Sequence, residues 1–220
     1  MILCIETATT NCSVAIFNGT ECVAFKEDSS SGYSHNEQLH VFVKEVCLQA
    51  SIDLSKLKAV AVSKGPGSYT GLRIGVSAAK GLCFALSIPL IAIDTLLILA
   101  QAAQDTSDFI IPMIDARRME VYTCVLDRER RLIDPTRAEV LSAASYAKFV
   151  NKGKVTFIGN GVEKWQKIGA HTKASFRSGI LPSAQNMGIL ANELFLKNEF
   201  VDVAYFEPYY LKDFQTFKSQ

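Results

Sequence analysis

The feature that most constrains the fold is a glycine-rich turn between an apolar strand and a helix rich in small residues. The strand is predicted over Leu57–Ser63, the turn over Gly65–Thr70 and the helix over Gly71–Leu86. A second strand, Pro89–Ile93, and a second helix, Thr95–Gln104, follow directly. This alternation of strands and helices predicts an α/β fold.

The chain before this unit predicts three strands and a helix. Met1–Thr7 is an apolar run that suits a central strand, and Cys12–Phe17 and Glu21–Lys26 flank an Asn-Gly dipeptide, which is the strongest short hairpin signal. A helix is predicted over Ser34–Ala50 because a Ser-x-x-Glu capping box opens it in front of periodic apolar residues.

The second half of the chain echoes the first. A polar stretch, Gln104–Asp108, predicts a boundary between two lobes, 1–104 and 105–220. Glu6 and Asp115 each end an apolar strand that leads into a second strand, which suggests a duplicated topology. Further predicted elements are strands over Phe109–Ile114, Glu120–Leu126 and Lys154–Ile158, helices over Ser142–Val150 and Ser183–Leu196, and an aromatic tail, 205–220, packed on the first lobe or on a partner.

The glycine-rich turn is a candidate phosphate-binding loop, because backbone amides at the start of a helix can bind an anion. The candidate residues are Gly65, Gly67, Ser68 and Thr70. The turn is not a Walker loop, since Leu72-Arg73 stands where Lys-Ser/Thr should follow. A tight turn in which Ser68 or Thr70 caps the helix is the competing interpretation.

The helix that follows needs a packing reason for its glycines. A glycine inside a helix costs roughly 1 kcal/mol relative to alanine, so Gly75 and Gly81 are expected to allow a close approach. That approach is made either by a neighbour within the chain or by a partner's helix, and the residues alone leave both open.

Candidate catalytic and metal-binding residues form no complete set. His35 and His40 are five positions apart, so they lie about 140° apart on a helix and cannot share one face. Glu6 and Asp115 could hold magnesium or act as a general base, or simply end their strands. A basic cluster suits either an RNA phosphate patch or a solvated hairpin; it comprises Arg117, Arg118, Arg128, Arg130, Arg131 and Arg137.

Charge and hydropathy predict a cytoplasmic protein. The 23 Lys and Arg residues nearly balance the 22 Asp and Glu residues, so any contact with nucleic acid is expected to be indirect. The N-terminus lacks the basic and long apolar regions of a signal peptide, and no apolar run reaches the length of a membrane span.

Several motifs together resemble the TsaB (YeaZ) family. The most specific is Gly65-Pro66-Gly67-Ser68-Tyr69-Thr70-Gly71-Leu72-Arg73-Ile74-Gly75. The others are Ile2-Leu3-Cys4-Ile5-Glu6-Thr7-Ala8-Thr9, Ser34-His35-Asn36-Glu37 with Leu39, Ile114-Asp115-Ala116-Arg117, Glu120-Val121-Tyr122 and Pro208-Tyr209-Tyr210-Leu211-Lys212.

This resemblance implies a duplicated actin-like (ribonuclease H-like, ASKHA) fold of two lobes with mixed sheets flanked by helices. It implies a non-catalytic partner of TsaD, the catalytic paralogue, and of TsaE, an ATPase, in forming threonylcarbamoyladenosine in tRNA. The metal pair of TsaD, H-x-x-x-H, is replaced by His35 and His40 at the wrong spacing. No cofactor is expected, and weak nucleotide binding at a partner interface stays open.

The resemblance also assigns the two helices to a bundle with TsaD, or with a second copy when the chain is alone. The partner-binding residues it implies are Leu39, Phe42, Val43, Val46, Gly71, Arg73, Gly75, Ala78, Ala79 and Leu82. The alternatives are an ATP-binding enzyme that uses Glu6 and Asp115, and a glycoprotease-type metallopeptidase that uses His35 and His40.

Overall fold

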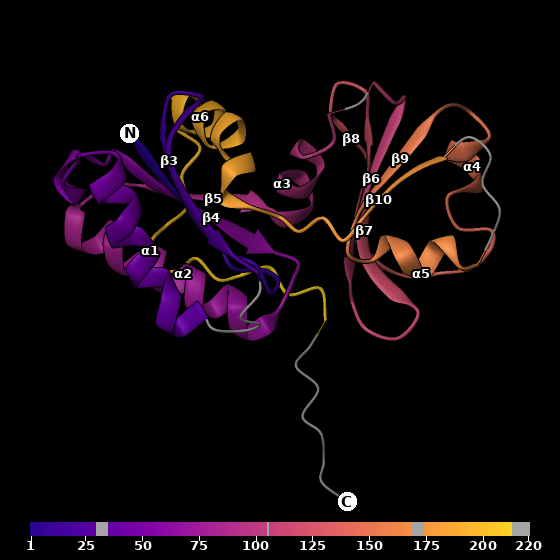
Figure 1. Cartoon of the computed structure of the whole chain (residues 1–220), viewed down its shortest axis with the longest axis horizontal. Coiled ribbons are helices and arrows are strands. Elements are labelled where there is room, and N and C mark those ends of the chain that lie inside the picture. Colours follow the sequence, from indigo (N-terminus) through magenta and orange to yellow (C-terminus); the bar gives the residue numbers. More distant parts are fainter. Residues whose placement is uncertain (30–34, 105, 169–173, 213–220) are drawn as a thin grey trace, which may run out of the picture.

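The computed structural model describes residues 1–29, 35–104, 106–168 and 174–212, which form two lobes around two five-stranded sheets (Figure 1). The sheet of the first lobe has the order β3-β2-β1-β4-β5. Its strands are β1 Ile2–Glu6, β2 Cys12–Asn18, β3 Glu21–Asp28, β4 Ala59–Gly65 and β5 Leu90–Asp94. The first three strands are antiparallel, and β4 and β5 continue the sheet in parallel.

The sheet of the second lobe repeats this order, as β8-β7-β6-β9-β10. Its strands are β6 Phe109–Asp115, β7 Glu120–Asp127, β8 Leu132–Val140, β9 Val155–Gly159 and β10 Ala174–Ser178. Three antiparallel strands are again followed by two parallel ones. The repeated topology confirms the predicted duplicated actin-like fold.

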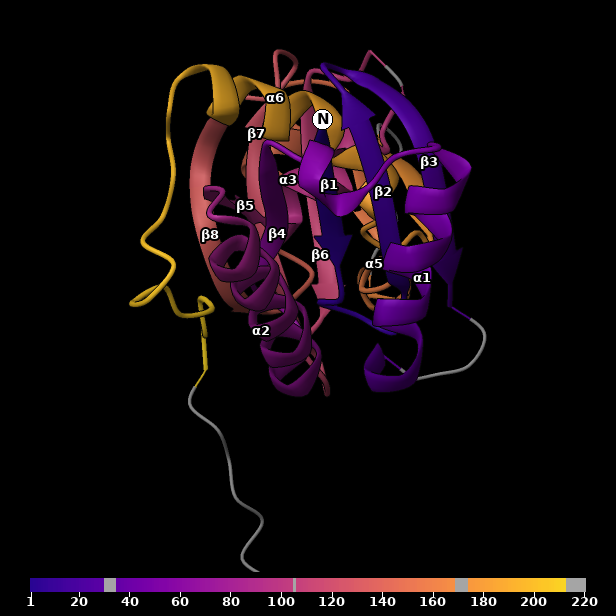
Figure 2. The same cartoon turned by 90° about the vertical axis from the view of Figure 1, so that its left-hand side faces the viewer.

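Helices cover both faces of the first sheet. Successive side chains of a strand point to opposite faces, and in this sheet both sets are apolar, so both faces have to be buried. Leu3 and Ile5 of β1 belong to a core with the helices α1 His35–Gln49 and α2 Tyr69–Leu86. Ile2 and Cys4 belong to a second core with α6, Gly188–Leu196. The helices α1 and α2 lie side by side on the outer face (Figures 1 and 2).

The helix α3, Thr95–Gln101, lies between the two sheets (Figure 1). Ile98 packs in the core of the first lobe with α6, whereas Leu96 and Leu99 pack with β6 and β9 of the second lobe. The two lobes are therefore joined by a shared apolar helix as well as by the chain itself.

The chain returns to the first lobe before its C-terminus. A 3-10 turn, Ala184–Asn186, and α6 pack on β1, β2 and β5, and Val201 bridges to Leu90. Asn11 Nδ2 donates to the carbonyl of Pro182 (3.1 Å), which fixes the start of the return. The division at residue 104 remains a prediction, and the return begins well before the tail expected at 205–220.

The second lobe contains elements that the sequence did not predict. The edge strands β8 and β10 were missed, and the helix expected over Ser142–Val150 is only α4, Ala147–Val150. A short helix, α5, spans Val162–Gln166.

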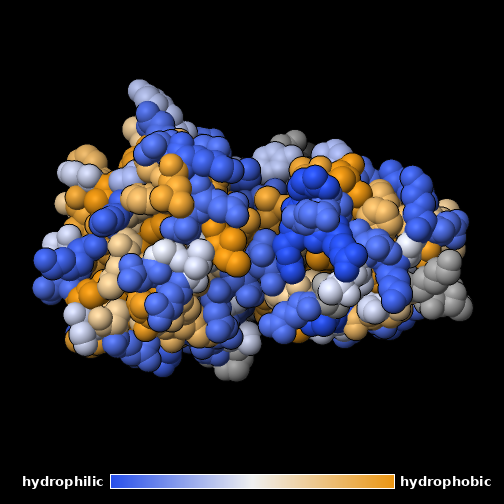
Figure 3. All heavy atoms as spheres, turned by 90° about the horizontal axis from the view of Figure 1, so that it is seen from above, coloured by the Kyte–Doolittle hydropathy of each residue, from blue (hydrophilic) through white to orange (hydrophobic). Residues whose placement is uncertain are grey.

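Seen from above, polar and apolar groups are interspersed on the surface of both lobes (Figure 3). None of the described helices is long and apolar enough to cross a membrane.

Candidate functional site

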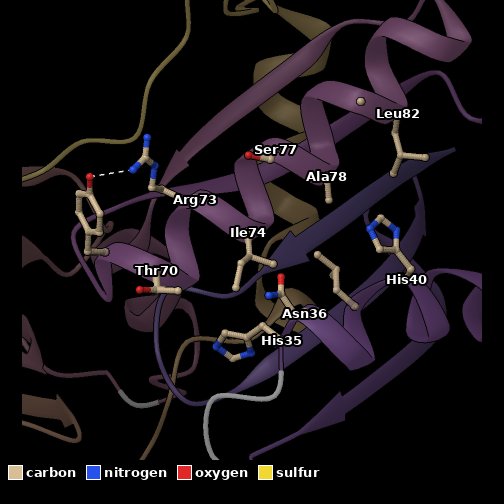
Figure 4. A pocket seen from close by; sticks show the side chains of 12 residues that line it. His35, Asn36, His40, Thr70, Arg73, Ile74, Ser77, Ala78 and Leu82 are labelled. Atoms are coloured by element: carbon tan, nitrogen blue, oxygen red, sulfur yellow. Dashed lines mark hydrogen bonds between the residues drawn. The ribbon is translucent and has the colours of Figure 1, made fainter.

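A groove of about 690 Å³ opens between α1 and α2 (Figure 4). Its floor is apolar, with Ile74, Ala78 and Leu82 half-buried on successive turns of α2. Polar side chains rim it, and Arg73 Nη1 donates to Tyr69 Oη (2.9 Å) at one end. Its lining is His35, Asn36, Leu39, His40, Tyr69, Thr70, Arg73, Ile74, Ser77, Ala78, Gly81 and Leu82.

The structure divides the predicted partner-binding residues into two groups. Leu39, Arg73, Ala78 and Leu82 line the groove. The others do not line the groove and are buried in the chain's own core, which favours a packing role for them over a partner-binding one; they are Phe42, Val43, Val46, Gly71, Gly75 and Ala79. Leu39 is itself fully buried in this core, so of the four groove residues only Arg73, Ala78 and Leu82 have exposed surface.

Gly71 and Gly75 allow α2 to approach the end of β1. A Cβ atom at Gly71 would stand 2.1 Å from the carbonyl oxygen of Thr7, and one at Gly75 would stand 2.2 Å from Thr7 Oγ1. Thr7 Oγ1 donates to the carbonyl of Gly71 (2.8 Å) across this contact. The packing reason for Gly75 is therefore a neighbour within the chain. At Gly81, which lines the groove, a Cβ would meet nothing within 4 Å.

The glycine-rich turn is closed by contacts within the chain. The amide of Ser68 donates to the carbonyl of Ala8 (2.7 Å), and the amide of Gly65 donates to Thr95 Oγ1 (3.1 Å). Ser68 Oγ accepts from the amide of Gly71 (3.3 Å), so Ser68 is the N-cap of α2. Since the amides of Gly65 and Ser68 already have acceptors, these contacts weigh against the candidate phosphate-binding role of Gly65, Gly67, Ser68 and Thr70.

A second concave site, of about 860 Å³, lies between the lobes. One wall comes from the loop after β1 and the start of α2, and the other from the β6–β7 turn and the segment 209–212. The C-terminal segment crosses from one wall to the other: the amide of Tyr209 donates to the carbonyl of Lys64 (2.6 Å), and Lys212 binds Glu120. Tyr210 packs on Tyr69 with ring centroids 4.9 Å apart, so the aromatic tail expected at 205–220 contacts the first lobe at this point.

Glu6 lies below this cleft and is fully buried. Its Oε1 accepts from the amide of Ala8 (2.6 Å) and from Ser63 Oγ (2.9 Å). Its Oε2 has no hydrogen-bond partner among the described residues. Burial raises the pKa of Glu6 from its ordinary value of 4.5 to about 7, against the opposing effect of these hydrogen bonds.

Asp115 ends β6 in the second lobe, as Glu6 ends β1 in the first. Its carboxylate is bound by a lysine side chain and a backbone amide. Its Oδ1 accepts from Lys164 Nζ (2.6 Å) and from the amide of Arg117 (2.6 Å). One carboxylate is buried beneath its loop and the other forms an ion pair, which favours the alternative that Glu6 and Asp115 end their strands over a shared magnesium site.

The two histidines of α1 are in different environments. His35 is buried, and its Nε2 lies 2.7 Å from the carbonyl oxygen of Thr9, so it acts as the donor of this hydrogen bond. Burial lowers the pKa of His35. His40 is exposed at the rim of the groove. Within the described ranges, no three His, Cys, Asp or Glu side chains are grouped so that they could hold a metal ion.

The duplicated lobes, the interlobe cleft and the open helical groove define a two-lobed protein of the actin-like class. The family model of tRNA N6-adenosine threonylcarbamoyltransferase, TsaD, matches residues 29–217. The tRNA threonylcarbamoyladenosine biosynthesis protein TsaB of Escherichia coli K12 is 31% identical over 96% of this chain and 94% of its own length. The solved structure of YeaZ from Pseudomonas aeruginosa is 27% identical, with a TM-score of 0.85 over 96% of this chain and 99% of that one.

A tRNA N6-adenosine threonylcarbamoyltransferase of Halalkalibacterium halodurans is 38% identical over 42% of this chain and 32% of its own length. The near full-length match to TsaB and the fold shared with YeaZ agree with each other. The chain belongs to the TsaB (YeaZ) family of tRNA threonylcarbamoyladenosine biosynthesis proteins.

Proposed function

We propose that this chain is a non-catalytic partner of a TsaD-type threonylcarbamoyltransferase, and that the groove between α1 and α2 is its docking surface. The observation that carries the proposal is the apolar face formed by Ile74, Ala78 and Leu82. These three side chains are only half-buried, and they line the open groove. Ala78 on this face and the neighbouring Ser77 and Gly81 are small, which allows another helix to pack at the roughly 8–10 Å spacing of close-packed helices.

The likeness between this chain and the transferase family supports the choice of partner. The family model of the transferase matches residues 29–217, a range that includes both helices. A transferase with this fold would carry its own counterparts of α1 and α2, and two helix pairs can close into a four-helix arrangement. For the same reason, a second copy of this chain takes the groove when the transferase is absent.

A non-catalytic role is supported by the state of the candidate catalytic groups. Glu6 is buried under its own loop, Asp115 is bound by Lys164, and His35 donates to the carbonyl of Thr9. In this proposal the transferase supplies the chemistry, the TsaE-type ATPase acts on the assembled complex, and nucleotide binds, if at all, at the interface between partners.

The experiment compares two charged substitutions on α2. Ala78→Glu places a carboxylate in the groove, whereas Ala85→Glu places it on an exposed position of the same helix outside the groove. A charge buried without a partner costs roughly 3 kcal/mol or more, so Ala78→Glu should weaken the dissociation constant for TsaD about a hundredfold. Calorimetry measures that constant, and the melting temperature of each variant alone confirms folding. A folded Ala78→Glu protein that binds TsaD as tightly as the Ala85→Glu protein would refute the docking surface.

A further inference from the structure

The six arginines of the basic cluster have different environments in the folded chain. Arg130 donates from its guanidinium to the carbonyls of Ala100 and Ala103 at the end of α3. Arg131 pairs with Asp127 and Glu129, and Arg137 pairs with Asp134 and Glu139. Arg128 is exposed at the far end of β7. Only Arg117 and Arg118 of this cluster line the interlobe cleft.

The two arginines occupy an unusual backbone conformation in the β6–β7 turn. Their φ angles are +69° and +49°, and they are the only adjacent non-glycine residues with positive φ in the part of the chain that the structure describes. Side chains other than glycine, asparagine and aspartate seldom adopt this conformation, and such strain concentrates at functional sites. A turn that needed only this conformation would be served better by Asn-Gly.

The acidic neighbours of this turn are already neutralised. Lys164 binds Asp115 and Lys212 binds Glu120, so neither carboxylate is left to balance the arginines. Neither guanidinium has an ion pair or a side-chain hydrogen bond with any of the described residues. Two uncompensated positive charges at the mouth of a concave site attract an anion.

The rest of the cleft has groups that suit a nucleotide unit. Thr9, Thr10, Ser68 and Thr70 present hydroxyl-bearing side chains on the opposite wall. The rings of Tyr122 and Tyr210 line the same site. Lys212 Nζ lies over Tyr122 and Tyr69 packs on Tyr210, so a base can stack only on the remaining face of each ring. Arginine is the side chain best shaped for a phosphate, which it can bind through two parallel N–H groups.

We propose that Arg117 and Arg118 form a phosphate site at the mouth of the interlobe cleft that binds single-stranded RNA. This inference rests on the proposed function, which places the chain in a complex that acts on tRNA. Tyr69 and Thr70 line both the groove and the cleft, so a partner docked in the groove ends beside this site. RNA presented by the transferase can therefore extend into it, and the contact with tRNA is direct rather than indirect.

The test measures the binding of a labelled single-stranded RNA dodecamer to the full chain by fluorescence anisotropy at several salt concentrations. Each phosphate contact to a single strand adds about 0.7 to the slope of log affinity against log salt, so Arg117→Gln with Arg118→Gln should reduce the slope by about 1.4. If the electrostatic contribution vanishes near 1 M salt, the affinity of this double Gln variant for the RNA at 0.1 M salt should be about 25-fold lower than that of the wild-type chain. The matched control, Arg128→Gln with Arg131→Gln, removes the same charge from the β7–β8 turn and should keep both values.

Further arms of the experiment separate charge from shape and RNA from free nucleotide. Arg117→Lys with Arg118→Lys retains the charges and should retain most of the salt slope. ATP should displace the RNA only at millimolar concentrations. The proposal is overturned if the wild-type chain does not bind the dodecamer at low salt, if the two double Gln variants lose the same affinity, or if ATP binds as tightly as RNA and is lost in the same variant. Any of these failures leaves the calorimetric test of the groove intact, because Ala78 and Arg117 lie on different elements.

Discussion

Gly75 lies so close to Thr7 that a methyl group on its Cα would stand 2.2 Å from Thr7 Oγ1. The middle of α2 is therefore held against the loop that follows β1, with only the Thr7 side chain between the two backbones. The adjacent hydrogen bond from Thr7 Oγ1 to the carbonyl of Gly71 (2.8 Å) makes this joint specific. Both concave sites of the first lobe depend on it, because α2 forms one wall of the groove and its first turn forms part of the cleft.

Gly75→Ala should destabilise the protein, because the added methyl group has to displace a buried threonine that is held by a hydrogen bond. Overpacking of this kind typically costs about 1–3 kcal/mol. Gly81→Ala is the matched control, since its Cβ meets nothing within 4 Å and alanine favours the helix by roughly 1 kcal/mol. Urea denaturation should show opposite shifts for the two variants. Equal shifts in the same direction would mean that the contact with Thr7 does not limit the packing of α2.

The two histidines of α1 should differ in the same assay. His35→Ala removes a buried ring and the hydrogen bond to the carbonyl of Thr9, which costs about 1–3 kcal/mol when the remaining acceptor stays buried. His40→Ala changes an exposed position and should stay within about 0.5 kcal/mol of wild type. A neutral His35→Ala substitution would show that this contact does not hold the start of α1 on the sheet.

The sequence predicted the first lobe well because its signals are local. The Asn-Gly hairpin, the apolar strands and the Ser68 cap each act within a few residues, and β2, β3 and α2 lie close to their predicted bounds. The edge strand β8 was missed because it contains Pro135 and several charges, and none of its residues is buried. Proline and charge are features of edge strands, which a search for apolar alternation does not detect.

The groove-facing residues of α2 could be predicted only in part, because two stripes of small or apolar residues run along that helix one position apart. Gly71, Gly75 and Ala79 form the stripe that is buried on the chain's own core. Ala78 and Leu82 belong to the stripe that faces the groove. Periodicity reveals both stripes but not which neighbour each one meets, since that depends on the distant residue Thr7.

Arg130 should contribute to stability through contacts between the lobes. Its guanidinium donates to the carbonyls of Ala100 and Ala103, at the C-terminal end of α3 where a positive charge also favours the helix dipole. Arg130→Ala should cost about 2–3 kcal/mol, as hydrogen bonds with a charged group do when they are partly buried. Arg128→Ala, an exposed change in the same turn, should cost less than about 0.5 kcal/mol. Equal thermal denaturation midpoints for the two variants would contradict this role.

Glu6 should make the stability of the protein depend on pH in the direction opposite to that of an ion-paired carboxylate. Burial raises its pKa from 4.5 to about 7, so between these values the folded chain keeps a proton that the unfolded chain has released. The free energy of unfolding therefore has its full contribution from Glu6 below pH 4.5 and loses it as pH rises through 7. At 1.36 kcal/mol per pKa unit, the loss is about 3 kcal/mol.

Glu6→Gln removes this dependence while keeping its structural contacts. The amide oxygen of glutamine can accept from the amide of Ala8 and from Ser63 Oγ as Oε1 does, and its NH2 group takes the place of Oε2, which has no partner among the described residues. Relative to wild type, the variant should be about 3 kcal/mol more stable at pH 8 than at pH 4.5, measured by urea denaturation at both values. Glu21→Gln removes an exposed carboxylate and should show no such change. The proposed complex with TsaD should keep its activity in the Glu6→Gln variant, because a carboxylate buried under its own loop is not placed to hold a catalytic magnesium ion. Loss of activity with the complex still assembled would instead assign Glu6 a catalytic or nucleotide-dependent role.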